Sequence, residues 1–190
     1  MLYNGLPVFD LTIEDDNIFS NVSLVDFPAI ERDFVKFAAE EQRIKFSVDD
    51  EKHIVNGPVL IPGQMIYRRN GDYEYYVRFD EKSIEDMALR FFKDHSNTNG
   101  NVMHEVTVDG VTYFESYIVN KERNISPVEF SDLPNGTWIM SAKIENEELW
   151  AAIKDGTIRG FSIDAYLTVT PAKDEIDSIE GLLEYLNKIQ

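Results

Sequence analysis

The sequence predicts a fold of the α+β class, in which strands predominate and a few helices accompany them. Two β-hairpins are predicted, because apolar runs flank Asn-Gly at 70–71 and Asp-Gly at 109–110, dipeptides that suit tight turns with positive φ. Two segments, 83–95 and 147–154, space their apolar residues as an amphipathic helix does. These observations together predict antiparallel strands grouped around a small number of helices.

The first half of the chain is expected to begin with short strands and loops. Apolar segments at 8–13, 22–25 and 34–37 alternate with acidic pairs and with Pro28. The β pattern strengthens from His53, beginning with the apolar run at 59–61, and the first hairpin is expected over 65–79. A helix over 83–95 follows, which Ser83 would cap with Asp86 three residues on.

The second hairpin is expected to pair 102–108 with 111–119, after a polar loop. A proline-containing loop then leads to a strand over 137–144 and to the helix over 147–154, for which Gly156 provides the C-terminal cap.

The segment 157–170 alternates between apolar and polar residues, so we expect one strand with Phe161 on the inward face and Ser162 on the polar face. Pro171 closes this strand. Asp174 then caps an amphipathic helix whose apolar stripe must bury against the domain or against a partner. We therefore divide the chain into a domain of residues 1–171 and a C-terminal amphipathic helix of residues 172–190.

Charge and composition narrow the functional classes. The 190 residues carry 18 Lys and Arg against 35 Asp and Glu, a net charge of −17, which argues against direct binding of nucleic acid or of an anionic membrane. There are no cysteines, so disulfides, thiolate metal sites and cysteine nucleophiles are excluded. The sequence begins without a signal-peptide pattern and has no apolar stretch of membrane-spanning length, so a soluble intracellular protein is expected.

The second hairpin predicts a pair of chemically useful side chains. If 109–110 is a two-residue turn, His104 lies directly opposite Glu115, and their side chains share one face. A carboxylate beside an imidazole fixes its tautomer, and the other ring nitrogen can then accept the proton of a serine hydroxyl. Ser162 is the candidate serine, because Gly160 two residues earlier leaves room for a substrate carbonyl. Ser116 is expected on the opposite face.

Each of these residues also has a structural interpretation. A histidine opposite a glutamate is more often an ion pair than a catalytic pair, and a single serine in a strand is more often structural. His53 is interpreted as a loop residue, and His95 as a cation at a helix end or a residue lining the same cleft. A zinc site is not expected, because no two histidines have helical i, i+4 spacing.

Several motifs resemble those of the phage prohead proteases, and most closely an XkdF-like serine protease branch. The similar segments are Ser-Leu-Val-Asp-Phe-Pro-Ala-Ile at 23–30, Gly-Pro-Val-Leu-Ile-Pro-Gly at 57–63, Phe-Glu-Ser-Tyr-Ile-Val at 114–119, Gly-Thr-Trp at 136–138 and Gly-Phe-Ser-Ile-Asp-Ala-Tyr at 160–166. The resemblance extends from about residue 20 to residue 168. It implies a fold similar to the herpesvirus assemblins, a mostly antiparallel closed β-barrel flanked by helices.

The resemblance also implies site residues. The family's nucleophile corresponds to Ser162 and its base to His104. The third member varies among relatives, and we assign it to Glu115 from the hairpin register; backbone amides near Gly160, assisted by Arg159, are expected to hold the oxyanion. The chain departs from the family pattern at Ala165, where relatives often have glycine.

What the resemblance implies about function is a serine endopeptidase of bacteriophage capsid maturation. Such proteins cleave scaffold and major capsid proteins inside the procapsid, in the host cytoplasm, and then often themselves. No cofactor or metal is expected, and a homo-oligomer is an open alternative by analogy with assemblins. The rival hypotheses are an inactive, protease-like structural or assembly protein of the virion and, on charge alone, an acidic module that binds a basic partner.

Overall fold

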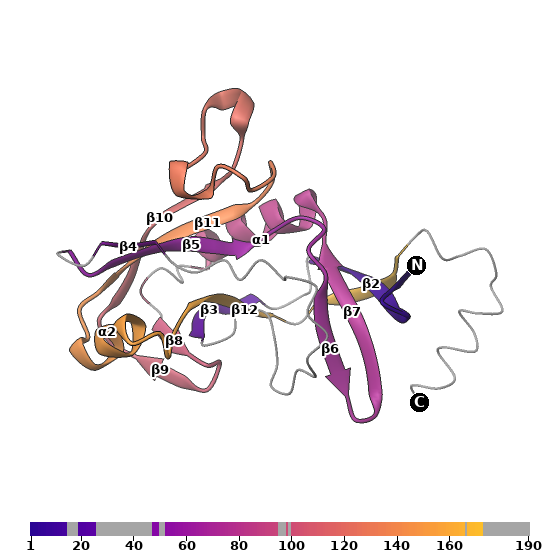
Figure 1. Ribbon diagram of the computed structural model, residues 1–190, viewed down its shortest axis with the longest axis horizontal. Helices are drawn as coiled ribbons and strands as arrows, with labels where there is room; N and C mark the ends of the chain where they lie inside the picture. Colours follow the sequence, from indigo (N-terminus) through magenta and orange to yellow (C-terminus); the bar gives the residue numbers. More distant parts are fainter. Residues whose placement is uncertain are drawn as a thin grey trace.

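The computed structural model describes residues 1–14, 19–25, 47–49, 52–94, 98, 100–165 and 167–172. Over these ranges the protein has an α+β fold, in which most elements are strands (Figure 1). The strands are β1 (Leu2–Tyr3), β2 (Leu6–Thr12), β3 (Phe19–Val25), β4 (Ser47–Asp49), β5 (Ile54–Leu60), β6 (Ile66–Asn70), β7 (Tyr73–Phe79), β8 (Gly100–Val102), β9 (Val106–Val108), β10 (Val111–Ile118), β11 (Trp138–Ile144), β12 (Gly160–Ala165) and β13 (Thr168–Pro171). The α-helices are α1 (Glu81–Lys93) and α2 (Glu147–Lys154), and short 3-10 helices form η2 (Lys121–Arg123) and η3 (Val128–Phe130).

The described strands form three separate sheets. The first sheet has the order β1-β2-β7-β6, with β13 also paired to β2; the second has the order β10-β11-β5-β4 and the third β12-β3-β8-β9. Most pairs are antiparallel, but β2 with β7 and β3 with β8 are parallel. Although β5 and β12 lie close together, no ladder joins them, so the described strands do not close into the expected barrel.

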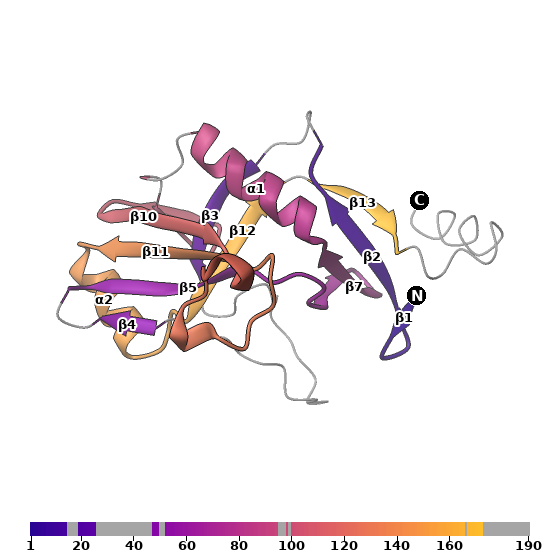
Figure 2. The same ribbon diagram turned by 90° about the horizontal axis from the view of Figure 1, so that it is seen from above.

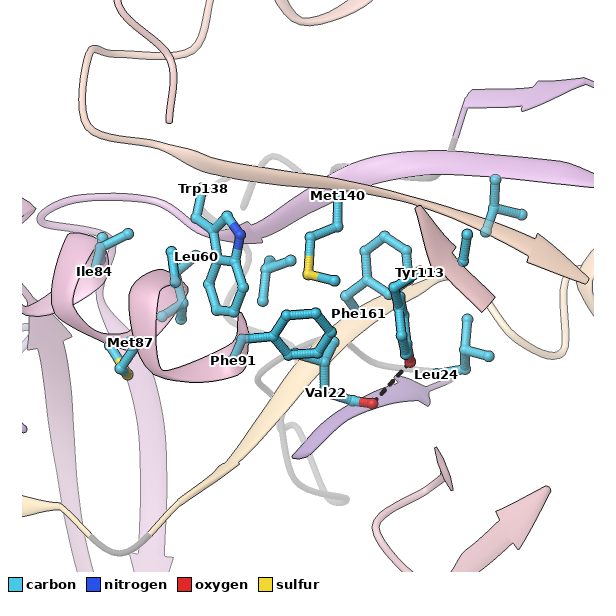
Figure 3. Close-up of a cluster of buried hydrophobic side chains, with 14 of the residues drawn as sticks. Val22, Leu24, Leu60, Ile84, Met87, Phe91, Tyr113, Trp138, Met140 and Phe161 are labelled. Atoms are coloured by element: carbon cyan, nitrogen blue, oxygen red, sulfur yellow. Dashed lines mark hydrogen bonds between the residues drawn. The ribbon is translucent and has the colours of Figure 1, made fainter. Parts of the chain in front are cut away.

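The main core lies between the second and third sheets, and α1 covers one side of it (Figures 2 and 3). The buried side chains at its centre are Tyr113, Trp138 and Met140 from the second sheet, Val22, Leu24 and Phe161 from the third, and Ile84, Met87 and Phe91 from α1. The Phe91 ring makes edge-to-face contacts with Tyr113 and Trp138 at centroid distances of 5.5 and 6.0 Å. The helix and both sheets therefore share one apolar interior.

A β-bulge at Phe114 reverses the two faces of β10. Before it, Val111 and Tyr113 are buried in the core, while the pairing of β10 with β11 shifts by one residue between Tyr113 and Glu115. Beyond it, Ser116 is on the core side, where its Oγ accepts a hydrogen bond of 2.8 Å from Trp138 Nε1. Because successive strand residues point to opposite faces, Glu115 lies on the outer face of the second sheet.

Several local predictions are confirmed. The first hairpin pairs Asn70 with Tyr73 across a turn in which Gly71 has a φ of 60°. Helix α2 also forms over the expected residues, and Gly156 follows its last turn with a φ of 81°. The described helices include none with the length and apolarity required to cross a membrane.

The predicted capping of α1 is wrong. The helix begins at Glu81, two residues earlier than expected, and its N-cap is Asp80, whose carboxylate accepts a hydrogen bond of 2.7 Å from Ser83 N. Ser83 is buried in the first turn instead of capping it. The predicted end at His95 lies outside the described residues, as do the strand predicted at 34–37 and the helix predicted from Asp174.

The predicted second hairpin is also wrong. Strand β9 pairs with β8, so Val108 is opposite Gly100, whereas β10 pairs with β11, so Val111 is opposite Ile144. Gly110 has a φ of 77°, but its carbonyl accepts a hydrogen bond from Glu145 N, and the bend carries the chain from the third sheet to the second. A turn signal does not specify which strands pair, and longer ladders are available elsewhere.

The strand predicted over 157–170 is divided. Residues 160–165 form β12 in the third sheet, and residues 168–171 form β13 in the first. Its alternating pattern is compatible with either arrangement, because each short strand keeps the two-residue period.

Candidate functional site

Ser162 lies in β12, directly opposite Ser23 of β3. Its neighbour Phe161 is buried in the core between the sheets, so Ser162 projects from the outer face of the third sheet. The predicted polar face is therefore correct in direction, but only 6% of Ser162 is exposed. Gly160 begins the same strand, two residues before Ser162, and so lies on the same face.

A polar row crosses the third sheet at Ser162. Ser162 pairs with Ser23, and Ser23 in turn pairs with Asn101 of β8. The Ser23 hydroxyl is completely buried and donates a hydrogen bond of 3.0 Å to Asn101 Oδ1. Three strands distant in sequence thus bring three short polar side chains into one line.

His104 lies in the turn between β8 and β9, not in a strand as expected. Met103 and His104 have φ values of 56° and 60°, in the left-handed region, and Glu105 N donates to Val102 O at 3.1 Å to close the turn. The turn is tied to the neighbouring strand, because Met103 N donates to Leu24 O at 3.0 Å. The His104 side chain is exposed.

The pairing scheme relates the His104 turn to the start of β12. Gly160 is opposite Val25, and Arg159 N donates a hydrogen bond of 2.8 Å to Val25 O. The His104 turn therefore lies beside the same end of β3 as Gly160. It is on the opposite edge of that strand, because β12 and β8 flank β3. Neighbouring strands are about 4.8 Å apart, which places the backbones of β12 and β8 roughly 10 Å apart across β3. The structure brings Ser162 and His104 to one sheet, but not to adjacent strands.

Glu115 is not brought together with Ser162 or opposite His104. It pairs with Ser141 of β11, whose buried hydroxyl donates a hydrogen bond of 2.6 Å to Glu115 Oε2. Because of the bulge, Glu115 lies on the outer face of the second sheet, whereas Ser162 lies on the outer face of the third, and the core separates them. The register that predicted Glu115 as the orienting group for His104 is therefore incorrect.

Glu115 belongs instead to a polar network on the second sheet. Asn56 Nδ2 donates a hydrogen bond of 2.8 Å to Ser141 Oγ, whereas Asn56 Oδ1 is buried without a hydrogen-bond partner in the described part of the chain. Burial raises the pKa of Tyr117; the neighbouring Asn56 amide opposes that rise, whereas the charges of Glu115 and Glu129 add to it. The arrangement is a hydroxyl and amide network that runs from Asn56 through Ser141 and holds the Glu115 carboxylate.

The remaining predicted residues are also placed by local contacts. Arg159 Nε donates a hydrogen bond to Gly156 O, so this side of the guanidinium contacts the C-terminal end of α2, where a cation is favoured. His53 stacks on Trp150 with a ring-centroid distance of 4.5 Å. His95 lies outside the described residues. Over the described ranges, no group of three or more His, Asp or Glu side chains is arranged to hold a metal ion.

Comparison with known protein families finds one family model that matches this chain. The model of the family described as "Putative phage serine protease XkdF" matches residues 41–170. The chain belongs to this family of phage serine proteases. The matched range contains Ser162, His104 and Gly160. No curated protein and no solved structure matches the chain.

Sequence reasoning missed two residues of the polar row, Ser23 and Asn101. Each stands between apolar or small residues in a strand, and this alternation marks a polar side chain on one face. The sequence could not indicate that these strands lie beside β12, because the pairings join segments far apart in the chain. Ser23 also lies before the range that the family model matches.

Proposed function

We propose that the protein is a serine endopeptidase in which Ser162 is the nucleophile and His104 is the general base. The proposal rests on one observation above all: the match to a phage serine protease family extends over both residues. The arrangement of the third sheet supports it further, because Ser162 and the His104 turn belong to the same sheet.

The proposed reaction is acyl transfer. Ser162 Oγ attacks the carbonyl carbon of the scissile peptide bond while His104 accepts the hydroxyl proton, and backbone N–H groups near Gly160 stabilise the tetrahedral oxyanion. His104 then donates that proton to the leaving amine, and a water molecule hydrolyses the acyl-enzyme by the same steps in reverse order. Because Gly160 lacks a side chain, the substrate carbonyl can approach the start of β12 closely.

For this reaction the imidazole of His104 must reach over β3. Between the two strands lies Ser23, a short side chain on the outer face that has no exposed surface, so the atoms that cover this row must move aside before the ring can pass. Catalytic hydrogen bonds are often longer in an enzyme without substrate and shorten in the reacting complex. We therefore propose that the His104 turn approaches Ser162 when substrate binds.

We further propose that the substrates are scaffold and capsid proteins of a phage procapsid, with cleavage of the protease itself as a later step. Membership of a phage protease family supports this choice, and the strongly acidic composition suits basic protein segments as partners better than nucleic acid. An assemblin-like barrel is the fold that the family resemblance implies; in the described residues β5 and β12 lie close together, but the strands form three sheets that no ladder joins.

The deciding experiment replaces Ser162 with Ala in cells that also produce the capsid and scaffold proteins of the same phage. We expect processing of these proteins to stop, because the attacking oxygen is lost, and Ser162-dependent labelling by a fluorophosphonate probe to disappear. Ser131→Ala, at an exposed serine, is the matched control and should process normally. Unchanged cleavage at the usual sites by the Ser162→Ala protein would refute the assignment.

A further inference from the structure

The polar row Ser162–Ser23–Asn101 differs from the row next to it. The next row toward the His104 turn consists of Phe161, Leu24 and Val102, all of which contribute to the core. Such rows alternate between the two faces of the sheet, so apolar rows face the core and the polar row faces outward. An outward row in contact with solvent requires no explanation, but Ser23 has no exposed surface and Ser162 has 6%.

Burial makes the hydroxyl of Ser23 costly unless it is paired. A buried polar group without a partner destabilises the folded protein, and an alanine or valine at this position would carry no such penalty. Ser23 meets the requirement by donating its only proton to Asn101 Oδ1 at 3.0 Å. The hydrogen bond fixes the orientation of the Ser23 hydroxyl and leaves its lone pairs as acceptors.

Those lone pairs lie beside Ser162. Residues directly opposite one another in an antiparallel pair have Cβ atoms ~4.5–5.5 Å apart, a separation that lets two serine hydroxyls form a hydrogen bond. Since the Ser23 proton is engaged by Asn101, Ser23 can only accept the proton of Ser162 in such a bond. A hydrogen-bonded chain through this row would therefore run from Ser162 to Ser23 to Asn101, of which the bond from Ser23 to Asn101 is observed.

We propose that Ser23 is a positioning residue that holds the Ser162 hydroxyl in one orientation, and that Asn101 keeps Ser23 in the accepting state. This inference rests on the proposed function of Ser162. This inference adds a hydrogen bond from Ser162 to Ser23 Oγ to the observed one from Ser23 to Asn101, and the added bond would place Ser162 Oγ at a fixed point on the outer face of β12. When His104 approaches, it takes over the same proton, and Ser23 remains unreacted throughout.

The proposal is tested by the kinetics of fluorophosphonate labelling, with Ser23→Ala, Ser23→Thr and Asn101→Leu compared with the wild type. We expect Ser23→Ala to lower the maximal labelling rate ~10- to 100-fold without changing the half-saturating probe concentration, because the nucleophile is misplaced and the probe site is intact. Ser23→Thr, which keeps the hydroxyl, should restore the rate, and Asn101→Leu should lower it as Ser23→Ala does. Ser141→Ala removes a buried strand serine from the other sheet and should leave the rate unchanged.

A second measurement separates this inference from the proposed function. Crystal structures of the wild type and of Ser23→Ala should show Ser162 Oγ within hydrogen-bonding distance of Ser23 Oγ in the wild type and in mixed rotamers in the variant. A wild type that is labelled no faster than Ser162→Ala would contradict the peptidase proposal, whatever the rotamer. Equal labelling rates for Ser23→Ala and the wild type, or a Ser162 hydroxyl turned away from Ser23, would overturn the positioning role.

Discussion

Tyr113 shows how a single residue joins two sheets. Its ring lies in the core, 3% exposed, and its hydroxyl donates a hydrogen bond of 2.8 Å to Val22 O of the third sheet (Figure 3). Burial raises the pKa of the Tyr113 phenol above its ordinary value of about 10. In the folded protein the Tyr113 phenol therefore stays protonated, and can donate this hydrogen bond, at every pH below about 10.

Replacing Tyr113 with Phe should lower the free energy of unfolding by about 1–2 kcal/mol at neutral pH, because Val22 O loses its donor while the ring is kept. Urea denaturation provides the measurement, with the partly exposed Tyr3→Phe as the control.

The same substitution should change the alkaline dependence of stability. The unfolded chain releases the phenol proton from about pH 10, whereas the folded chain retains it, so the contribution of Tyr113 is complete below pH 10 and is lost as the pH rises further. In the Tyr113→Phe variant this part of the alkaline loss of folding stability should be absent. A wild type and variant with parallel stability curves between pH 9 and 11 would contradict this assignment.

Prediction at the residue scale succeeded where it needed only the local pattern. Alternation around Ser162 correctly placed its side chain away from the core. The relation between His104 and Glu115 required the register of a particular strand pair. A bulge at Phe114 and a different partner for β10 changed that register, and neither has a distinctive sequence signal.

At the scale of elements, α1 depends on its N-terminal cap. Asp80 accepts a hydrogen bond from Ser83 N and places a carboxylate near the positive end of the helix dipole. Asp80→Ala should therefore lower the free energy of unfolding by about 1 kcal/mol, as measured by urea denaturation. Asp80→Asn keeps the acceptor oxygen and should lower the free energy of unfolding by only about a few tenths of a kcal/mol. A larger loss for Asn than for Ala would show that the cap is not what Asp80 contributes.

The elements themselves could be predicted because their signals are local. The apolar stripe of α1 and the Asn-Gly turn of the β6–β7 hairpin require only a few neighbouring residues. Even so, two residues three apart, Asp80 and Ser83, could each act as the cap, and only packing distinguishes them, since Ser83 is buried. The Asp109-Gly110 turn was correctly identified as a bend, but it connects two sheets instead of two strands of one hairpin.

For the molecule as a whole, Phe91 packs α1 against the second sheet inside the core that both sheets share. It has no exposed surface and contacts the rings of Tyr113 and Trp138, whereas its neighbour Phe92 is 51% exposed. Phe91→Ala should destabilise the protein by about 3–5 kcal/mol, because it leaves a cavity where three elements meet. Phe92→Ala removes the same atoms from the surface and should cost less than about 1 kcal/mol. Equal losses in melting temperature would mean that the core does not depend on Phe91.

The α+β class could be predicted, but the arrangement of the sheets could not. Strand and helix periodicities are properties of short segments, whereas the third sheet assembles β12, β3 and β8 from three distant parts of the chain. The barrel expected from family resemblance is replaced, over the described residues, by sheets that meet along β5 and β12 without a ladder. Long-range pairings of this kind are set by the packing of the whole interior.

The bulge at Phe114 has a consequence for how relatives of this protein are compared. Residues that match by position in an alignment are assumed to occupy the same environment, but in β10 that holds only if the extra residue is present in both chains. In a relative that lacks the bulge, a glutamate could align with Glu115 in sequence. Its carboxylate would nevertheless lie on the same face of the strand as Tyr113, which is the core side. In this strand, equivalence between homologues must be judged by counting residues from the bulge.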